Sequence, residues 1–431
     1  MTSASVRRSI GRLALASAAL ASLESAGFYL FWWWRVIAGG LQGPDFFAFY
    51  AAARLFLARG GNHLYFLPAQ KEFQSQVTAE WGPGPYTLLP YIHPPHFILL
   101  IAPLGWLPYH PAYLVWAVVN LGLAAVATAV MARSAGLGMV QTVFAVACLA
   151  GFLPLFITLL QGQSDLLILA LLAGSFAAWA AGREATAGAL AALAMIKPQL
   201  LVLVPLLFVA RRSGRALAGF AATGIGLLAI SLIAVGPIAV RDYLGIVLSW
   251  LVGGHAGWPI AAQSMYSLRG LFEQLPLGRS LSLFALAVIA LATTVALLRG
   301  KPQPRLDFAL AVAVSVSLSP YLNLHDLVLL ALPALAIGTL ALDGRLRRPA
   351  LGIVAIAVLA IGTEVTLLAG SWTALAGVIA LAAYLVGERL YAHEKPFAVT
   401  QIGDHGDVHN QPADLEQRHS MDHLPDLIRD Q

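Results

Sequence analysis

The sequence predicts an all-α membrane protein, a polytopic bundle of about eleven or twelve transmembrane helices. Two compositional features support this prediction, since 59% of the 431 residues are hydrophobic and only 11% are charged. A soluble domain carries about 25% charged residues, so this chain could not cover itself with a hydrated surface. The third observation is the number of long apolar runs, many of which reach the roughly 17–25 residues that a spanning helix needs.

The first apolar run extends from about residue 11 to residue 34, after a basic start that contains Arg7, Arg8 and Arg12. This beginning is similar to a signal peptide, but the run is longer than the apolar part of one and no clear cleavage site interrupts it. We therefore predict a first spanning helix that stays attached to the chain.

Short basic clusters separate many of the apolar runs and predict which loops face the cytoplasm. These clusters are Arg7/Arg8, Arg211/Arg212/Arg215, Arg299/Lys301/Arg305 and Arg345/Arg347/Arg348. The N-terminus is then cytoplasmic, and outer loops are expected at about 38–93 and 238–280. Within these loops, the apolar and aromatic segments 46–59 and 241–252 are expected to form interfacial helices that lie along the membrane surface.

The middle of the chain allows two arrangements. If the run at 96–107 spans the membrane, residues 161–165 face the cytoplasm. If that run is re-entrant, and the run at 185–210 consists of two half-helices broken at Lys197, residues 161–165 lie outside. We favour the second arrangement because it also places two further arginines in cytoplasmic loops. The later runs alternate regularly with the basic clusters, at about 216–237, 282–298, 307–322, 326–342, 350–369 and 371–391.

The last part of the chain differs in composition from the rest. Residues 393–431 are acidic, contain scattered histidines and are nearly free of aromatic side chains. A segment of this kind cannot bury enough apolar surface to fold. We therefore predict a transmembrane domain over residues 1–392 and a disordered cytoplasmic tail over residues 393–431.

Several classes of function are disfavoured by missing motifs. The sequence has no phosphate-binding glycine loop, zinc motif or nucleophile elbow, which argues against ATP-driven pumps, zinc proteases and the usual serine hydrolases. Its single cysteine, Cys148, excludes an internal disulfide and a thiolate metal site. The net charge of +5 is divided among short clusters rather than forming a stripe, so no nucleic-acid partner is expected.

Polar side chains among apolar residues cost free energy in a membrane and therefore need a reason. Asp45 follows the first helix and is expected to cap the helix at 46–59, to act as a general base at the membrane surface, or both. Lys197 is a lone cation that either reaches towards an interface or binds an anion such as a phosphate. Minor candidates, each of which also fits a structural role, include Tyr91, His93 and Arg269.

Two short polar segments interrupt the apolar runs. Gln163 and Asp165 belong to the sequence QGQSD at 161–165, and His325 belongs to SPYLNLHD at 319–326. Each segment fits a turn between helices, and each also fits a site whose side chains face a polar ligand.

An ordered set of motifs from about residue 40 to residue 330 resembles glycosyltransferase family 87, a family of type C, polyprenyl-phosphate-sugar-dependent membrane enzymes. In chain order, the motifs are DFFAFYAAARLFLARGGNHLY, YIHPPHFILLIAPLGWLP, VWAVVN, GQSD and MIKPQLL. The family usually has asparagine where GQSD has Asp165, so a charge replaces an amide at this position.

The resemblance implies a type C helical fold and transfer of a sugar, with inversion, from a polyprenyl phosphate to a hydroxyl of a glycolipid or glycan. It makes Asp45 the catalytic base, and mannose is the sugar that it favours. The expected setting is the outer face of a bacterial cytoplasmic membrane, and no cofactor or metal is expected to be essential. Residues expected to bind the donor phosphate or another part of the substrates are Lys197, His325, Arg269, Arg54, Gln163, Asp165, Tyr91 and His93.

A transporter or lipid flippase is the alternative from another functional class. It would need polar residues near the middle of the bilayer and access to both sides of the membrane. In the favoured arrangement, the polar segments gather towards one face, which supports the enzyme.

Overall fold

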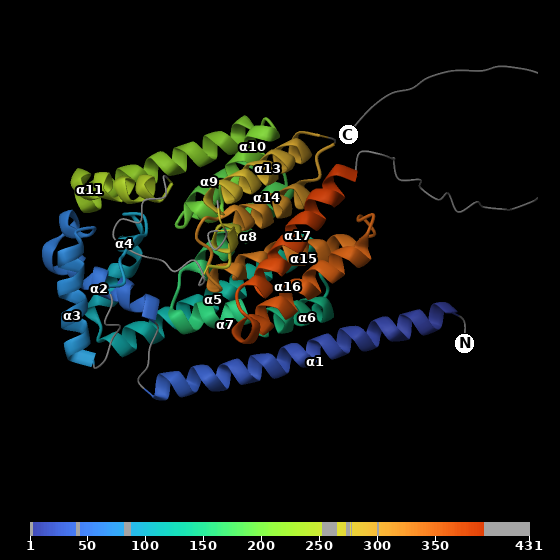
Figure 1. The fold of residues 1–431 in the computed structure, drawn as a ribbon, viewed down its shortest axis with the longest axis horizontal. Helices are drawn as coiled ribbons and strands as arrows, with labels where there is room; N and C mark the ends of the chain where they lie inside the picture. The colour runs from blue at the N-terminus through green and yellow to red at the C-terminus, as the bar shows by residue number, and fades with distance from the viewer. Residues whose placement is uncertain are drawn as a thin grey trace, which may run out of the picture. The chain divides into compact units, whose positions relative to one another are not determined.

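The computed structural model describes residues 3–39, 44–81, 88–251, 265–272, 276, 278–299 and 301–391. All regular elements in these ranges are helices (Figure 1). The first half of the chain forms α1 (Ser3–Ala38), α2 (Pro44–Arg59), η1 (Gly61–His63), α3 (Leu67–Trp81), α4 (Phe97–Ile101), η2 (Ala102–Trp106), α5 (Tyr109–Ala135), α6 (Met139–Ala150), α7 (Leu153–Gln161), α8 (Asp165–Ala180) and α9 (Glu184–Leu193). The second half forms η3 (Pro198–Leu200), α10 (Leu203–Ala210), α11 (Gly214–Leu251), α12 (Leu268–Phe272), α13 (Gly278–Leu298), α14 (Pro304–Leu318), η5 (His325–Leu330), α15 (Ala331–Leu342), α16 (Pro349–Ala369) and α17 (Trp372–Tyr391).

The predicted class, a bundle of membrane-spanning helices, is confirmed. Within the described residues, 6 stretches of helix are long and apolar enough to cross a membrane, and the bent pair α6 and α7 raises the number to 7. The chain bends by 58° between the two helices of that pair. The sequence estimate of about eleven or twelve passages also counted shorter apolar helices, such as α8 and α9.

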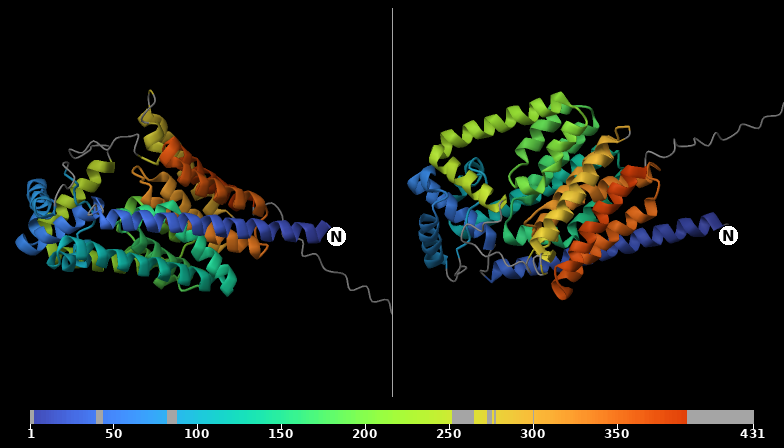
Figure 2. Two further views of the ribbon diagram at one scale, coloured as in Figure 1. Left: turned by 90° about the horizontal axis from the view of Figure 1, so that it is seen from below. Right: turned by 45° about the horizontal axis from the view of Figure 1, so that its top comes forward.

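The first helix, predicted at about 11–34, is present as α1, and it runs alongside α6 and α7 (Figures 1 and 2). Tyr29 holds it in place by stacking on Phe156, with ring centroids 4.8 Å apart. The Tyr29 hydroxyl also donates a hydrogen bond to the carboxylate of Glu364 on α16. One aromatic side chain therefore connects α1 to two other helices of the bundle.

The two segments expected to lie along the membrane surface are both helical. The first is α2, which the chain itself covers, because residues 46–53 are all buried against α3, α4, η2 and neighbouring elements. The second belongs to α11, which changes direction at Gly236 and Pro237 (Figure 2). Gly236 has a φ of 81°, a value that glycine adopts readily and other residues avoid.

The middle of the chain has the broken geometry of the favoured arrangement. Residues 97–106 form only the short elements α4 and η2, and the run at 185–210 is divided into α9, η3 and α10. Lys197 lies at the break, directly before Pro198, whose missing N–H prevents a continuous helix. Before the break, α9 packs very closely on α11, where a Cβ at Gly188 would lie only 1.9 Å from the carbonyl oxygen of Ala216.

A buried ion cluster joins three helices at the end of the bundle that carries the basic clusters. Asp307 on α14 pairs with Arg211 at the end of α10 and with Arg389 on α17, each at 2.7 Å. The predicted tail over residues 393–431 lies outside the described residues, as do residues 252–264 of the predicted second outer loop.

Candidate active site

Asp45 lies in the first turn of α2, and its side chain is partly exposed. A carboxylate in this position is favoured by the partial positive charge of the helix N-terminus, which agrees with the structural role expected from the sequence. Gln163 Nε2 donates a hydrogen bond of 2.7 Å to Asp45 Oδ2. The two residues are 118 positions apart, so the fold brings together two residues that the sequence analysis selected separately.

Gly162 places Gln163 beside Asp45. It ends α7 in the left-handed conformation, with a φ of 68°, and its carbonyl oxygen accepts a hydrogen bond of 2.8 Å from Trp116 Nε1. A Cβ at this position would lie 2.6 Å from the Cβ of Phe46, the residue after Asp45. The close approach of α7 to α2 therefore depends on the absence of a side chain at Gly162.

Gly162→Ala is expected to destabilise the protein by about 1–3 kcal/mol, because the added methyl group overpacks the contact with Phe46. Gly182→Ala is the matched control, since Gly182 has a φ of 71° but nothing within 4 Å of an added Cβ. Thermal unfolding in detergent would compare the two variants. An equal loss of stability in the two variants would mean that the cost comes from the positive φ alone and that the contact with Phe46 contributes nothing.

Lys197 lies at the centre of a buried network beneath the Asp45–Gln163 pair. Its ammonium group donates hydrogen bonds of 2.9 Å to both carboxylate oxygens of Asp165 and one of 2.8 Å to Asp326 Oδ1. Asp165 is fully buried, and Lys197 and Asp326 are 8% and 2% exposed. Two roles were expected for Lys197, reaching towards an interface or binding an anion. The structure shows the second, and the anions are two carboxylates of the chain itself.

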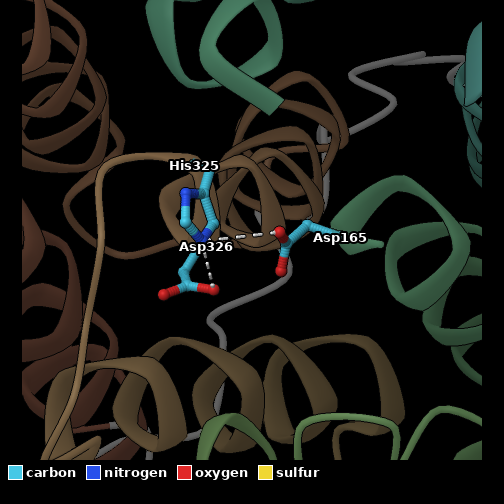
Figure 3. Close-up of side chains that lie close together, drawn as sticks. All are labelled: Asp165, His325 and Asp326. Carbon is cyan, nitrogen blue, oxygen red and sulfur yellow. Dashed lines mark ion pairs between the residues drawn. The ribbon is translucent and has the colours of Figure 1, made fainter. Parts of the chain in front are cut away.

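His325 borders the same network. Its Nδ1 lies 2.5 Å from Gln161 Oε1, and since an amide oxygen only accepts, Nδ1 carries a proton in this contact. Its Nε2 lies 3.5 Å from Asp326 Oδ1 and 4.0 Å from Asp165 Oδ2 (Figure 3). The imidazole therefore faces carboxylate oxygens on one edge and the last residue of α7 on the other.

The three side chains drawn in Figure 3 could in principle hold a metal ion, because one ligand atom from each lies within 4.8 Å of the others. The Lys197 ammonium, however, already bonds three of the carboxylate oxygens of Asp165 and Asp326. A metal ion would have to compete with this built-in cation for the same oxygens. The expectation that no metal is essential stays a prediction.

The polar segments around residues 161–165, Lys197 and His325 thus form one site, with Asp45 at its more exposed edge. Comparison with protein families gives a match to the model described as Glycosyltransferase family 87 over residues 91–320, which is more than half of the 431-residue chain. The chain belongs to glycosyltransferase family 87. It is a multi-pass membrane glycosyltransferase, and this membership favours the enzyme over the transporter alternative.

The family 87 match contains Gln163, Asp165 and Lys197 but begins after Asp45 and ends before His325. The roles of the last two residues therefore depend on the geometry of this chain. Comparison with curated proteins and with solved structures gives no match.

Two of the predicted site residues of this glycosyltransferase are buried behind the site. His93 is packed between Phe49 and Phe97, and its Nε2 lies 3.3 Å from Ser164 Oγ. Burial, together with the charge of Lys197, lowers the pKa of His93 well below its ordinary value, so this ring is neutral at physiological pH. Tyr91 is 1% exposed, and burial raises the pKa of its hydroxyl well above the ordinary value. Neither side chain provides a cation for a phosphate.

The two remaining predicted cations of the glycosyltransferase are engaged by other side chains. Arg54 forms an ion pair of 3.2 Å with Glu80. Arg269 on α12 lies over the ring of Tyr321, with its guanidinium carbon 5.0 Å from the ring centroid. Tyr321 belongs to the polar segment that also contains His325, which places Arg269 against that segment.

Sequence reasoning did not select Asp326 and Gln161 as site residues. Both lie within polar segments that were recognised, but either could have belonged to an ordinary turn. A signal was available for Asp326, because a carboxylate next to an apolar run needs a buried cation, and Lys197 was a lone buried cation in need of an anion.

Proposed function

We propose that this glycosyltransferase transfers a sugar from a polyprenyl phosphate to a hydroxyl of a glycolipid or glycan, with inversion at the anomeric carbon. The observation that carries the proposal is the partly exposed carboxylate of Asp45, held through Oδ2 by Gln163. Gln163 binds Asp45 through Oδ2, and we assign Oδ1 as the oxygen that accepts the proton. A general base needs this kind of arrangement, in which one oxygen is oriented and the other is accessible.

In the proposed step, the acceptor oxygen bonds to C1 of the sugar as the bond from C1 to the phosphate oxygen breaks. The acceptor hydroxyl gives its proton to Asp45, and the polyprenyl phosphate leaves as an anion. The hydroxyl becomes acidic as its oxygen bonds to carbon, so a carboxylate is a sufficient base late in the reaction. The leaving phosphate needs no proton, but its developing negative charge must be stabilised.

The buried network has consequences for the binding of the donor phosphate. Lys197 carries one positive charge, whereas Asp165 and Asp326 carry two negative charges when ionised. This network has no positive charge left over for a phosphate. We therefore assign Lys197 the role of holding Asp165 and Asp326 in place beside His325. Arg269 remains the proposed phosphate-binding cation, with His325 as a further proposed contact, and Arg54 is a weaker candidate because of its pairing with Glu80.

Gln163 is assigned to positioning Asp45. Gln163→Met keeps the length of the side chain but removes the donor, and it is expected to lower kcat by roughly 10- to 100-fold, the effect of losing one hydrogen bond to a charged group. A double-mutant cycle tests whether Gln163 acts through Asp45. If it does, adding Gln163→Met to an Asp45→Asn variant lowers kcat no further. Full additivity of the two losses would contradict this assignment.

The donor class is tested with the purified full chain in nanodiscs. Radiolabelled polyprenyl-phosphate sugars, with mannose first and arabinose second, would be incubated with a membrane glycolipid extract. Transfer of label to an extractable glycolipid or glycan supports the proposal, and the anomeric configuration of the product tests inversion. Absence of transfer from every polyprenyl-phosphate sugar by folded protein would contradict the proposed donor class. The proposed setting is the outer face of a bacterial cytoplasmic membrane, with residues 1–392 as the transmembrane domain.

A further inference from the structure

A small cavity lies at the end of the bundle that carries the basic clusters, between the start of α16 and the end of α17. Its volume is about 170 Å³, and its lining includes Arg347, Arg348, Tyr384, Glu388 and Tyr391. This position contains none of the residues proposed to act in sugar transfer. The cavity therefore needs an account of its own.

The charges around the cavity favour an anion. Arg347 and Arg348 are exposed, and Arg348 lies over the Tyr391 ring with its guanidinium carbon 4.8 Å from the ring centroid. Glu388, the acidic residue among the lining residues, accepts a hydrogen bond from the backbone N–H of Arg347. The cavity thus combines two guanidinium groups with a carboxylate that already has a backbone partner.

The local backbone adds to this preference. Arg348 is the residue before α16, a helix of 21 residues, so the first turn of α16 borders the cavity with its partial positive charge. An anionic oxygen beside Arg348 would therefore be favoured by the guanidinium groups and by the partial positive charge at the start of this helix.

The surroundings point to a lipid as the source of the anion. Both α16 and α17 are candidate membrane spans, so their adjoining ends lie near the level of the lipid headgroups. Directly after the basic turn, α16 exposes Leu351, Ile353 and Val354, which are 52%, 58% and 55% exposed. A bound phosphate would have an apolar helix face beside it, as a lipid with acyl chains requires.

We propose that this cavity is a binding site for the phosphate headgroup of an anionic membrane lipid. Arg347 and Arg348 hold the phosphate, and the lipid-exposed side of α16 receives an acyl chain. The Glu388 contact attaches the basic turn to α17, which keeps the two arginines near the cavity. The site is separate from the proposed sugar transfer and does not depend on it.

The test is native mass spectrometry of the full chain in detergent, titrated with phosphatidylglycerol or with phosphatidylcholine. We expect retention of phosphatidylglycerol over phosphatidylcholine, and about a fivefold weaker retention in Arg348→Gln, the effect of about one surface charge. Arg348→Lys keeps the charge and is expected to recover most of the binding. Arg345→Gln is the matched control, because Arg345 is exposed in the same turn but does not line the cavity.

Three results would overturn the proposal. Equal losses in Arg345→Gln and Arg348→Gln would mean that diffuse charge, rather than a cavity, retains the lipid. Displacement of phosphatidylglycerol by an equal concentration of inorganic phosphate would identify a phosphate site rather than a lipid site. Equal retention of the two lipids by the wild type would mean that the cavity does not select anions. If Arg348→Gln does not fold, the comparison of wild type, Arg348→Lys and Arg345→Gln decides among these results.

Discussion

Asp45→Asn is expected to lower the rate of sugar transfer by about 10²- to 10⁴-fold, the usual contribution of a general base. Asparagine has nearly the same shape as aspartate, and its amide oxygen can still accept the hydrogen bond from Gln163 Nε2. The substitution therefore removes the basic oxygen while it keeps the start of α2 and the contact to the turn after α7. Initial rates of label transfer and the Kd for the lipid-linked donor, measured in nanodiscs, would separate loss of catalysis from loss of binding.

Glu72→Gln provides the control for a change of charge in the neighbouring part of the chain. Glu72 lies on α3, and its exposed carboxylate pairs with Arg59. An exposed ion pair of this kind contributes little, so transfer is expected to stay within about twofold of the wild type. Undiminished transfer by Asp45→Asn would remove Asp45 from the mechanism and direct attention to Asp165 and Asp326.

Lys197→Met is expected to cause the largest loss of stability, about 3–5 kcal/mol, because it leaves buried carboxylates without their cation. Lys197 supplies three hydrogen bonds to Asp165 and Asp326, and both carboxylates are almost completely inaccessible. Methionine fills a similar volume, so the substitution tests the charge rather than the packing. The measurement is the thermal unfolding of purified protein in detergent.

Asp165→Asn is the informative partner for that experiment. It leaves one cation facing one carboxylate, and it introduces the amide that the resemblance in the sequence leads us to expect at this position. A cost of about 1 kcal/mol is expected, since an amide oxygen can still accept a hydrogen bond from the Lys197 ammonium. If Lys197→Met proved as stable as Asp165→Asn, the ammonium group of Lys197 would not be needed to stabilise the two buried carboxylates.

The elements of the fold could largely be predicted from the sequence, because long apolar runs in a chain with few charges have few alternatives to spanning helices. The break at Lys197 was also predictable, since Pro198 cannot continue a helix. The direction change within α11 was not predicted, although Gly236 and Pro237 are a pair of residues suited to it. The expected surface segment at 241–252 was therefore treated as a separate helix.

The composition of the site was harder to predict from the sequence, because its contacts join residues that are distant along the chain. Lys197 was recognised as a cation in need of an anion, but its partners Asp165 and Asp326 lie 32 and 129 positions away. Local patterns carry no information on such pairs unless each buried charge is matched with every other. Arg54, Tyr91 and His93 were selected for their residue types, and the structure gives each of them neighbours within the protein.

The order of the charges along the chain has a consequence for biogenesis. Asp165 begins α8 and Lys197 follows α9, so these two helices can enter the bilayer as a hairpin in which Asp165 and Lys197 compensate each other at one end, while Arg183 and Glu184 lie in the turn at the other. An unpaired charge beside an apolar segment costs free energy at insertion, and early pairing lessens that cost. Asp326 is synthesised later and can join only when its segment docks against the preformed hairpin. Completion of the catalytic region would then coincide with a late stage of assembly, so that partly inserted intermediates are inactive.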